Sequence, residues 1–156
     1  MKYIQSNKEK NGCVFCLAAN MQDNPENLIV SRGKHAFVIL NRYPYTSGHL
    51  MVVPFNHQPT IIGLDAETRA EMMELSALCV RVLQSVYHPQ GFNVGINIGA
   101  AAGAGIREHV HMHIVPRWNG DTNFMSALGG TRVIPETLEE SYWRIYHCWE
   151  AGDIEN

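Results

Sequence analysis

The sequence predicts an α+β domain in which one long helix crosses a mostly antiparallel sheet and a second helix follows near the C-terminus. The prediction rests on the order of elements: short strand-like runs come first, one long helical stretch interrupts them, and further strand-like runs follow. With 156 residues, 46% of them hydrophobic and 17% charged, the chain has the size and composition of one globular domain. We therefore expect residues 1–156 to form a single domain, with its core over about 13–120 and a helical extension over about 135–150.

The first half of the chain is expected to contribute two strands. Residues 1–26 contain Asn-Gly and Asn-Pro turn signals and are expected to be irregular. Residues 28–32 form a short apolar run that Gly33 breaks. The expected strands are His35–Asn41 and His49–Val53, separated by a loop with Pro44 and Gly48, and Pro54 stops the second. These two strands are therefore expected to pair in antiparallel fashion.

The long helix is expected over Asp65–Val86. Asp65 is a good N-cap, and apolar residues then recur at steps of three and four along one face. The remaining expected elements are a strand over Phe92–Ile98, a glycine-rich loop over Gly99–Gly105, a strand over His109–Val115 and a helix over Pro135–Trp149.

Charge and termini argue against several classes of protein. The chain has 12 basic and 15 acidic residues, and a formal charge of −3 does not suit a nucleic-acid binder. No apolar run approaches the about 18 residues that a membrane span needs. The segment Met1–Asn11 is polar and unlike a secretory signal, so we expect a cytoplasmic protein, and in that compartment four cysteines are poor evidence for disulfides.

Three histidines alternate with apolar residues in the last expected strand. Side chains on a strand alternate faces, so His109, His111 and His113 share one face and the apolar residues share the other. We expect the apolar face to pack on the core and the histidine face to be open to a partner. The outer two histidines of a strand start about 13 Å apart, whereas metal–nitrogen bonds are about 2.0 Å long. One terminal histidine serving a metal, with the others acting as nucleophile, proton carrier or phosphate ligand, fits better than a single ion bound by all three.

The pair Cys13-Val-Phe-Cys16 is one half of a possible zinc site. A structural zinc site needs four ligands, commonly two cysteines and two histidines, and His57 and His109 are candidates for the other half. Two unrelated cysteines remain an alternative at this point. A redox role is disfavoured because no βαβ pattern surrounds the pair.

The glycine-rich loop precedes the histidines directly. Small residues allow backbone amides to approach an anion closely, and Gly103, Gly105 and Ile106 lie just before His109. A simple tight turn is the alternative reading, but the neighbouring histidines favour a phosphate-binding loop.

Taken together, these motifs resemble the histidine triad family. The stretch 109–115 matches the family's signature of three histidines alternating with apolar residues, 37–54 is similar to its nucleoside-binding half, and 97–105 is similar to its phosphate loop. The stretch 115–125 resembles the bacterial branch that acts on diadenosine tetraphosphate, including its phosphorylases. The resemblance covers roughly residues 13–120 and implies a HIT-like fold.

The resemblance also implies roles for individual residues. His111 would attack the α-phosphate and form a nucleotidyl-histidine intermediate, His113 would bind and orient phosphate oxygens, and His49 would support the surroundings of the nucleophile. The implied nucleotide-binding residues are Asn41 for the ribose, Leu40 and Phe37 for the base, and Asn97, Gly103, Gly105 and Ile106 for the phosphates. The implied ligands of a structural zinc ion are Cys13, Cys16, His57 and His109, and no metal is expected at the reacting phosphate. Family members are usually homodimers that share a sheet, so a homodimer is expected.

One feature departs from the family pattern. Many members carry Gln or Ser about four residues before the first triad histidine, whereas Gly105-Ile-Arg-Glu108 has neither. Backbone amides would have to make that contact, or Thr122 and Asn123 could reach the site. Arg117 and Arg132 could meet the distal phosphates of a long substrate, and solvated surface charge is the alternative for each.

The resulting hypothesis is an enzyme that cleaves dinucleoside polyphosphates at the α-phosphate, with water, phosphate or another acceptor completing the reaction. Two alternatives use the same nucleotide site: an adenylyl-phosphoramidate hydrolase, and a nucleotide-binding signalling module whose turnover is incidental. A third alternative is a metal enzyme of another class, but a closed site with four protein ligands would have no open position for substrate.

Overall fold

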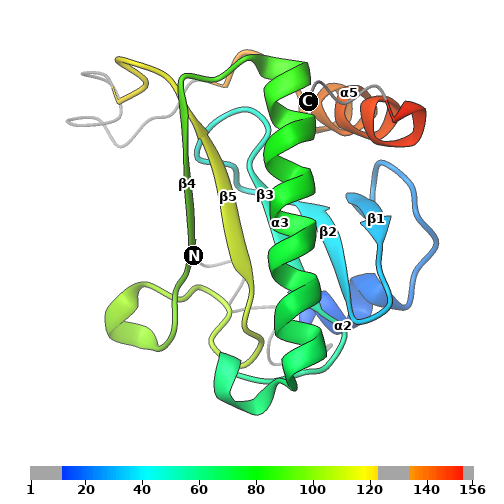
Figure 1. The fold of residues 1–156 in the computed structure, drawn as a ribbon, viewed down its shortest axis with the longest axis vertical. Coiled ribbons are helices and arrows are strands. Elements are labelled where there is room, and N and C mark those ends of the chain that lie inside the picture. Colours follow the sequence, from blue (N-terminus) through cyan, green and yellow to red (C-terminus); the bar gives the residue numbers. More distant parts are fainter. Residues whose placement is uncertain (1–11, 123–133, 153–156) are drawn as a thin grey trace.

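The computed structural model describes residues 12–122 and 134–152, and an antiparallel five-stranded sheet in the order β1-β2-β3-β5-β4 forms its centre (Figure 1). The strands are β1 Ile29–Arg32, β2 Ala36–Leu40, β3 Leu50–Pro54, β4 Gly91–Ile96 and β5 Met112–Arg117. The helices are α2 Val14–Ala19, α3 Ala66–Tyr87 and α5 Leu138–Ala151, with 3₁₀ turns at η1 Ile61–Gly63 and η2 Ala100–Ala102. The predicted α+β class is confirmed.

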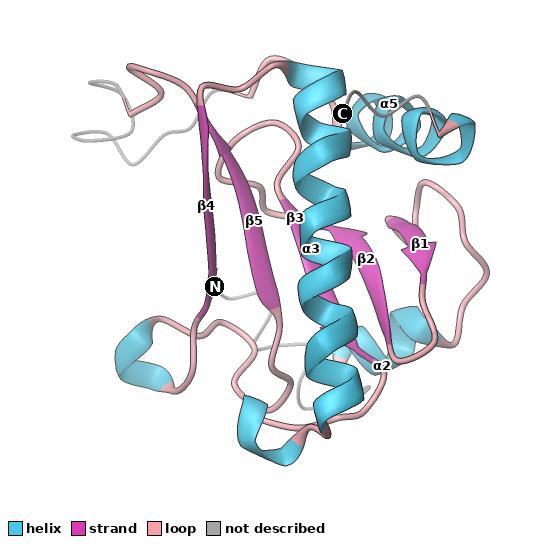
Figure 2. Ribbon diagram, viewed as in Figure 1, coloured by secondary structure: helices cyan, strands magenta, loops and turns pink. Residues whose placement is uncertain are grey.

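Helix α3 covers one face of the sheet (Figures 1 and 2). The Asp65 carboxylate accepts a hydrogen bond from the Thr68 amide at 2.7 Å, so the predicted N-cap is confirmed. The buried side chains of α3 pack on the sheet, and the Ser76 hydroxyl lies 2.9 Å from the Met112 sulfur of β5. The sheet face that carries Met112 is therefore the α3 side.

The strand register assigns every other side chain to a face. Met51 pairs with His113 and with Ile39, so these three share the face opposite α3. Leu50 pairs with Ile114 and with Leu40, and these lie on the α3 side. The candidate site must therefore lie on the face opposite α3.

Helix α5 begins with a capping box. The Thr137 hydroxyl accepts from the Glu140 amide at 3.2 Å, and the Glu140 carboxylate accepts from the Thr137 amide at 2.7 Å. Tyr142 and Ile145 are buried, and the helix contacts α3 and β1. The C-terminal extension thus packs on the same core as the sheet.

Three expectations about the fold are corrected. Residues 1–26 are not wholly irregular, because they contain α2. The strand predicted over His109–Val115 begins only at Met112 and continues through Pro116, which pairs with Phe92 at the edge of the ladder instead of stopping the strand. The glycine-rich loop contains the short 3₁₀ turn η2. Within the described ranges, no helix combines the length and apolar character that a membrane span requires.

Candidate active site and metal centre

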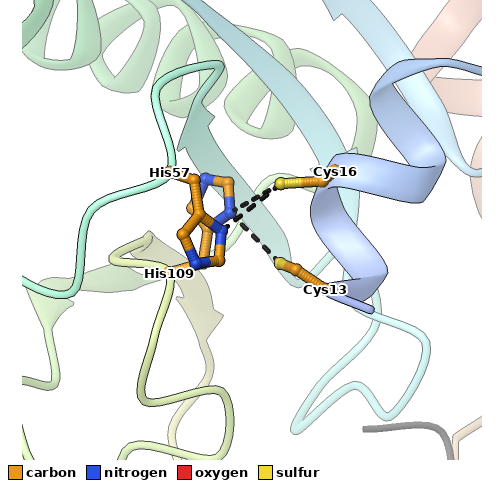
Figure 3. Close-up of side chains that lie close together, drawn as sticks. All are labelled: Cys13, Cys16, His57 and His109. Carbon is orange, nitrogen blue, oxygen red and sulfur yellow. Dashed lines mark hydrogen bonds between the residues drawn. The ribbon is translucent and has the colours of Figure 1, made fainter. Parts of the chain in front are cut away.

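Two cysteines and two histidines from three separate segments meet beside the sheet (Figure 3). Cys13 and Cys16 come from the start of α2, His57 from the loop after β3, and His109 from the segment before β5. Their ligand atoms all lie within 4.8 Å of one another. The sequence pattern alone left unrelated cysteines as an alternative, and the structure brings the four side chains together.

The spacing of these four atoms fits a zinc ion. The Cys13 Sγ lies 3.2 Å from the His109 Nδ1, and the Cys16 Sγ lies 3.4 Å from the His57 Nδ1 and 3.6 Å from the His109 Nδ1. A tetrahedral ion with bonds of about 2.0 Å to nitrogen and 2.3 Å to sulfur needs ligand atoms about 3.5 Å apart. Burial, together with the neighbouring Cys13 thiol, raises the pKa of the Cys16 thiol. Such a rise is expected where two thiols lie together without a cation to stabilise their thiolate forms.

A backbone contact sets the orientation of His109. Its Nε2 lies 2.8 Å from the Pro54 carbonyl oxygen, and a carbonyl only accepts, so Nε2 carries the proton. The unprotonated Nδ1 then faces the two thiols, as a metal ligand must. This is the usual arrangement of a ligating histidine whose second nitrogen is held by an acceptor.

His111 is held in the opposite tautomer. Its Nδ1 lies 2.8 Å from the His109 carbonyl oxygen, so Nδ1 donates and Nε2 carries the lone pair. Burial lowers the pKa of this imidazole below its ordinary value of 6.5. A neutral imidazole with a fixed lone pair at Nε2 is a competent nucleophile near neutral pH.

His113 and His49 form a second hydrogen-bonded pair. The Tyr45 amide donates to the His49 Nδ1 at 3.1 Å, so His49 carries its proton on Nε2 and donates it to the His113 Nδ1 at 2.9 Å. The remaining nitrogen of His113, Nε2, is therefore an N–H donor. Burial and the nearby His111 lower the pKa of His113 to about 4, which keeps it neutral at pH 7.

The expectation that the histidine face is open is wrong for two of the three histidines. His109 is 1% exposed and His111 is 4% exposed, whereas His113 is intermediate. Helix α2 covers them: the Phe15 ring centroid lies 5.4 Å from that of His109 and 5.0 Å from that of His111. This aromatic side chain was not among the predicted site residues.

The predicted base-binding residues lie on different faces. Phe37 is on the His113 side of the sheet, although it is fully buried and packs on Phe55. Leu40 lies on the α3 side, away from His113. Ile39 and Met51, which were not among the predicted site residues, also lie on the His113 side and are 6% and 7% exposed.

The predicted ribose and phosphate residues lie near the histidines along the chain and the sheet. Asn41 follows β2, and its amide nitrogen is 3.4 Å from the His49 Nδ1. Asn97 follows β4, one residue beyond the pair formed by Ile96 and Met112. The Gly103 amide donates to the Ala100 carbonyl within the loop, so this amide is already engaged, and Gly105 and Ile106 follow it toward the histidines.

Two polar residues after the histidines make contacts with their own neighbours. Arg117 donates to Asp121 at 2.5 and 2.7 Å and to Asn93 at 2.7 Å, so its guanidinium is committed to structural contacts. The Thr122 hydroxyl lies 3.3 Å from Asp121. Asn123 and Arg132 lie outside the described residues.

Comparison with known proteins identifies the family. The model of the HIT domain matches residues 22–120, well over half of the chain. The chain belongs to the HIT family. The Cys13–Cys16 pair lies outside the matched range, so the metal cluster is described from the geometry of this chain.

The relatives include enzymes and zinc-bound proteins. An "AP-4-A phosphorylase" from Mycobacterium tuberculosis is 46% identical over 116 residues, which cover 74% of this chain and 60% of that protein. The match thus spans less than two thirds of that relative's length. A Zn-bound histidine triad family protein from Mycobacterium smegmatis superposes with a TM-score of 0.72 at 29% identity, covering 90% of this chain and 95% of that one. A histidine triad nucleotide-binding protein from Sulfolobus tokodaii gives 0.70 at 26% identity, covering 89% and 93%.

Proposed function

We propose that this chain is a nucleotidyl hydrolase or transferase that cleaves dinucleoside polyphosphates, such as diadenosine tetraphosphate, at the α-phosphate. The observation that carries the proposal is the fixed tautomer of His111, whose Nδ1 donates to the His109 carbonyl and leaves a lone pair on Nε2. The likeness to an AP-4-A phosphorylase indicates the class of substrate.

The reaction is a double displacement at phosphorus. The Nε2 of His111 attacks the α-phosphorus, a P–N bond forms, and the P–O bond to the leaving nucleotide breaks. Water or inorganic phosphate then attacks the same phosphorus, the P–N bond breaks, and His111 returns as a neutral imidazole. Phosphoryl-type transfers depend mainly on positioning and charge stabilisation, which the fixed histidines supply.

His113 and His49 support the transferred group. The Nε2–H of His113 donates to a phosphate oxygen, and the His49–His113 hydrogen bond of 2.9 Å keeps that proton in place. Asn41, Asn97, Gly105 and Ile106 complete our proposed nucleotide site, together with Ile39 and Met51 on the same face. The role of three further predicted groups in the nucleotide site is indirect, because Phe37 and Leu40 are buried and the Gly103 amide already donates to Ala100.

Cys13, Cys16, His57 and His109 would hold a zinc ion with a structural role. Four protein ligands complete a tetrahedral shell and leave no position for substrate, so the ion would tie α2 to the sheet. The chemistry at phosphorus is assigned to the histidines alone.

A homodimer joined through β4 is part of the proposal. β4 is an edge strand of the sheet, and its residues 93–95 are exposed, with Val94 at 46%. An exposed edge strand with an apolar side chain is suited to pairing with a second copy. We also propose a cytoplasmic location, since the free cysteines of the cluster belong in a reducing compartment.

One observation favours a second candidate, an adenylyl-phosphoramidate hydrolase. The Arg117 guanidinium, which follows the histidines along β5, is engaged by Asp121 and Asn93. A substrate with a single phosphate needs no cation for distal phosphates, so the shorter substrate also fits the described residues.

Product analysis tests the proposal. The wild type and His111→Ala are incubated with diadenosine tetraphosphate, with and without inorganic phosphate, and products are separated by chromatography. ADP and ATP formed only with phosphate indicate a phosphorylase, whereas AMP and ATP formed without it indicate a hydrolase. Turnover of an adenylyl-amine alone would replace the first candidate by the second, and full activity of His111→Ala would refute both.

A further inference from the structure

Helix α2 is fastened to the rest of the fold at its N-terminal end by the metal cluster. Cys13 is its N-cap residue and Cys16 lies in its first turn, and both thiols reach the histidines of the cluster (Figure 3). The N-cap makes no side-chain hydrogen bond to the helix. The contacts of the two thiols with the histidines, and not a side-chain cap, therefore connect this end of the helix to the rest of the fold.

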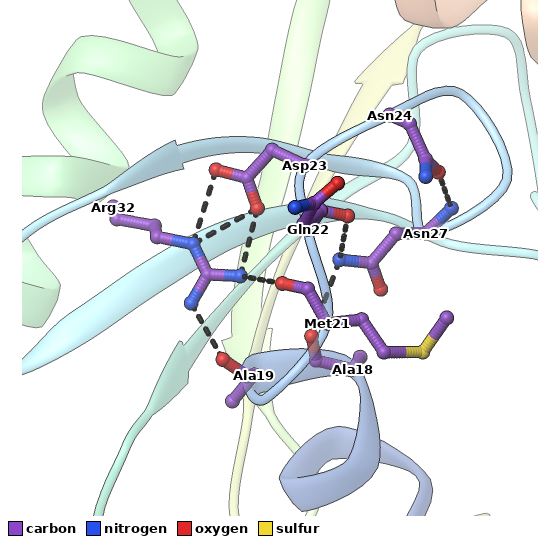
Figure 4. Close-up of polar contacts among 8 residues, drawn as sticks. All are labelled: Ala18, Ala19, Met21, Gln22, Asp23, Asn24, Asn27 and Arg32. Carbon is purple, nitrogen blue, oxygen red and sulfur yellow. Dashed lines mark hydrogen bonds and ion pairs between the residues drawn. The ribbon is translucent and has the colours of Figure 1, made fainter.

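A separate polar network fastens the C-terminal end of the same helix. The Arg32 guanidinium donates to the Ala19 carbonyl at 2.7 Å and to the Met21 carbonyl at 3.0 Å, and Asp23 pairs with it at 2.7 Å (Figure 4). The Asn27 side-chain amide, which is buried, donates to the Ala18 carbonyl at 3.2 Å. The Ala18 and Ala19 carbonyls belong to the last turn of α2, where carbonyls have no partner within the helix and a cation is favourable.

The one buried side chain of α2 is Phe15, and its ring packs against His111, the proposed nucleophile. Phe15 is 3% exposed, and its ring is tilted by 57° to the His111 ring at a centroid distance of 5.0 Å. It meets the His109 ring edge-on at 5.4 Å. His111 is thus restrained twice, by the hydrogen bond from Nδ1 and by the aromatic ring packed against it.

A helix of this size cannot hold its own position. It has 6 residues, far fewer than the about 12–15 that an isolated helix needs to be even marginally stable in water. The place of the Phe15 ring is therefore set by the two fastenings, and not by the helix itself.

We propose that Phe15 is a positioning residue for His111: α2, fastened at both ends, packs this ring against the imidazole and fixes the direction of its Nε2 lone pair. The inference rests on the proposed function in one respect, namely that His111 is the nucleophile. It gives the metal cluster a second task, which is to hold α2 so that the nucleophile keeps its orientation.

Three variants test the proposal in the zinc-loaded protein. Phe15→Ala removes the ring, Phe15→Leu keeps apolar volume without it, and Leu17→Ala changes an exposed residue of the same helix as a matched control. The single-turnover rate of nucleotidyl-His111 formation is measured after alkaline quench by mass spectrometry. The zinc content, the melting temperature and the ¹⁵N signals of the His111 ring are recorded alongside.

The expected result is a loss in rate without a matching loss in binding. Phe15→Ala slows formation of the adduct about tenfold to hundredfold, as small misplacements of reacting groups do, while KM changes little. Phe15→Leu recovers part of the rate, and Leu17→Ala behaves as the wild type. In Phe15→Ala the ¹⁵N signals of His111 shift toward averaging between its two tautomers, a change that a purely structural role would not produce.

An unchanged rate together with unchanged His111 signals in zinc-bound Phe15→Ala would overturn the inference. If Phe15→Ala loses its zinc, Arg32→Gln decides, because it loosens the other end of α2 without touching ring or metal: a slower rate supports the inference and a wild-type rate overturns it. A wild type that forms no adduct would instead overturn the proposed function, so the two failures are distinguishable.

Discussion

Removing the zinc ion should release α2 and leave the sheet folded. The perturbation is a chelator at neutral pH, or Cys16→Ser, which deletes one of the four ligands. Either change removes the fastening at the N-terminal end of the helix. The predicted outcome is local unfolding of α2.

Burial of Phe15 alone does not offset the backbone entropy that is lost when α2 becomes ordered. Ordering the backbone of its 6 residues costs about 6–12 kcal/mol at about 1–2 kcal/mol per residue. Burial of Phe15 returns only about 2–3 kcal/mol. Zinc binding in small zinc-dependent peptides contributes about 10–16 kcal/mol at pH 7, enough to offset the difference. The strands β2 and β3 do not depend on the ion, because all of their residues are buried in the core.

Hydrogen exchange read by mass spectrometry distinguishes local from global release. Peptides covering Val14–Ala19 should lose protection after chelation, while peptides covering Ala36–Leu40 keep it. Cys148→Ser, a thiol outside the metal cluster, serves as the control and should change neither. Loss of protection in both peptides together, or in neither, would refute this reasoning.

Three further predictions concern the supports of the fold and the site. Burial alone would raise the pKa of the Glu71 carboxyl. Hydrogen bonds from three amides between β1 and β2 outweigh burial, and the net effect lowers this pKa below its ordinary value of 4.5. Glu71→Gln should therefore lower the free energy of unfolding by about 1–3 kcal/mol at pH 7, and the difference should vanish as the pH falls through the folded pKa, as denaturant titrations at several pH values would show. Gly48→Ala should cost about 1–3 kcal/mol by thermal denaturation, because Gly48 has φ +78° and a Cβ would lie 2.7 Å from an α3 ring; Gly91→Ala, with open space, should cost less. His49→Ala should lower kcat at least about tenfold by freeing the tautomer of His113, and an unchanged kcat would contradict that role.

Local signals predicted most of the fold. The cap at Asp65 and the apolar stripe that follows place α3 within one residue at each end. Pro54 lies at the end of β3, as predicted, whereas Pro116 pairs with Phe92 inside β5, so the proline signal located one strand end and missed the other. The short helix α2 gives no such signal, since its stability comes from contacts made far along the chain.

The site was predictable in its residue types and less so in its geometry. The paired cysteines and the alternating histidines are visible in the sequence, and the structure brings the four expected zinc ligands together. The sequence could not show which β2 side chains point toward α3 and which toward His113, because all five residues of the strand are apolar and buried and show no alternation. Leu40 was predicted to contact the base, whereas the register places Leu40 on the α3 side and Ile39 on the His113 side. The contact of Phe15 with His111 joins residues far apart in the sequence and was invisible to local pattern.

The most direct measurement is detection of the covalent intermediate on His111. The wild type is mixed with excess diadenosine tetraphosphate, quenched in alkali to preserve a phosphoramidate, digested and analysed by mass spectrometry. The proposed mechanism predicts an adenylyl group on His111 and none in His111→Ala. An adenylyl group on another residue, or product formation at full rate by His111→Ala, would contradict it.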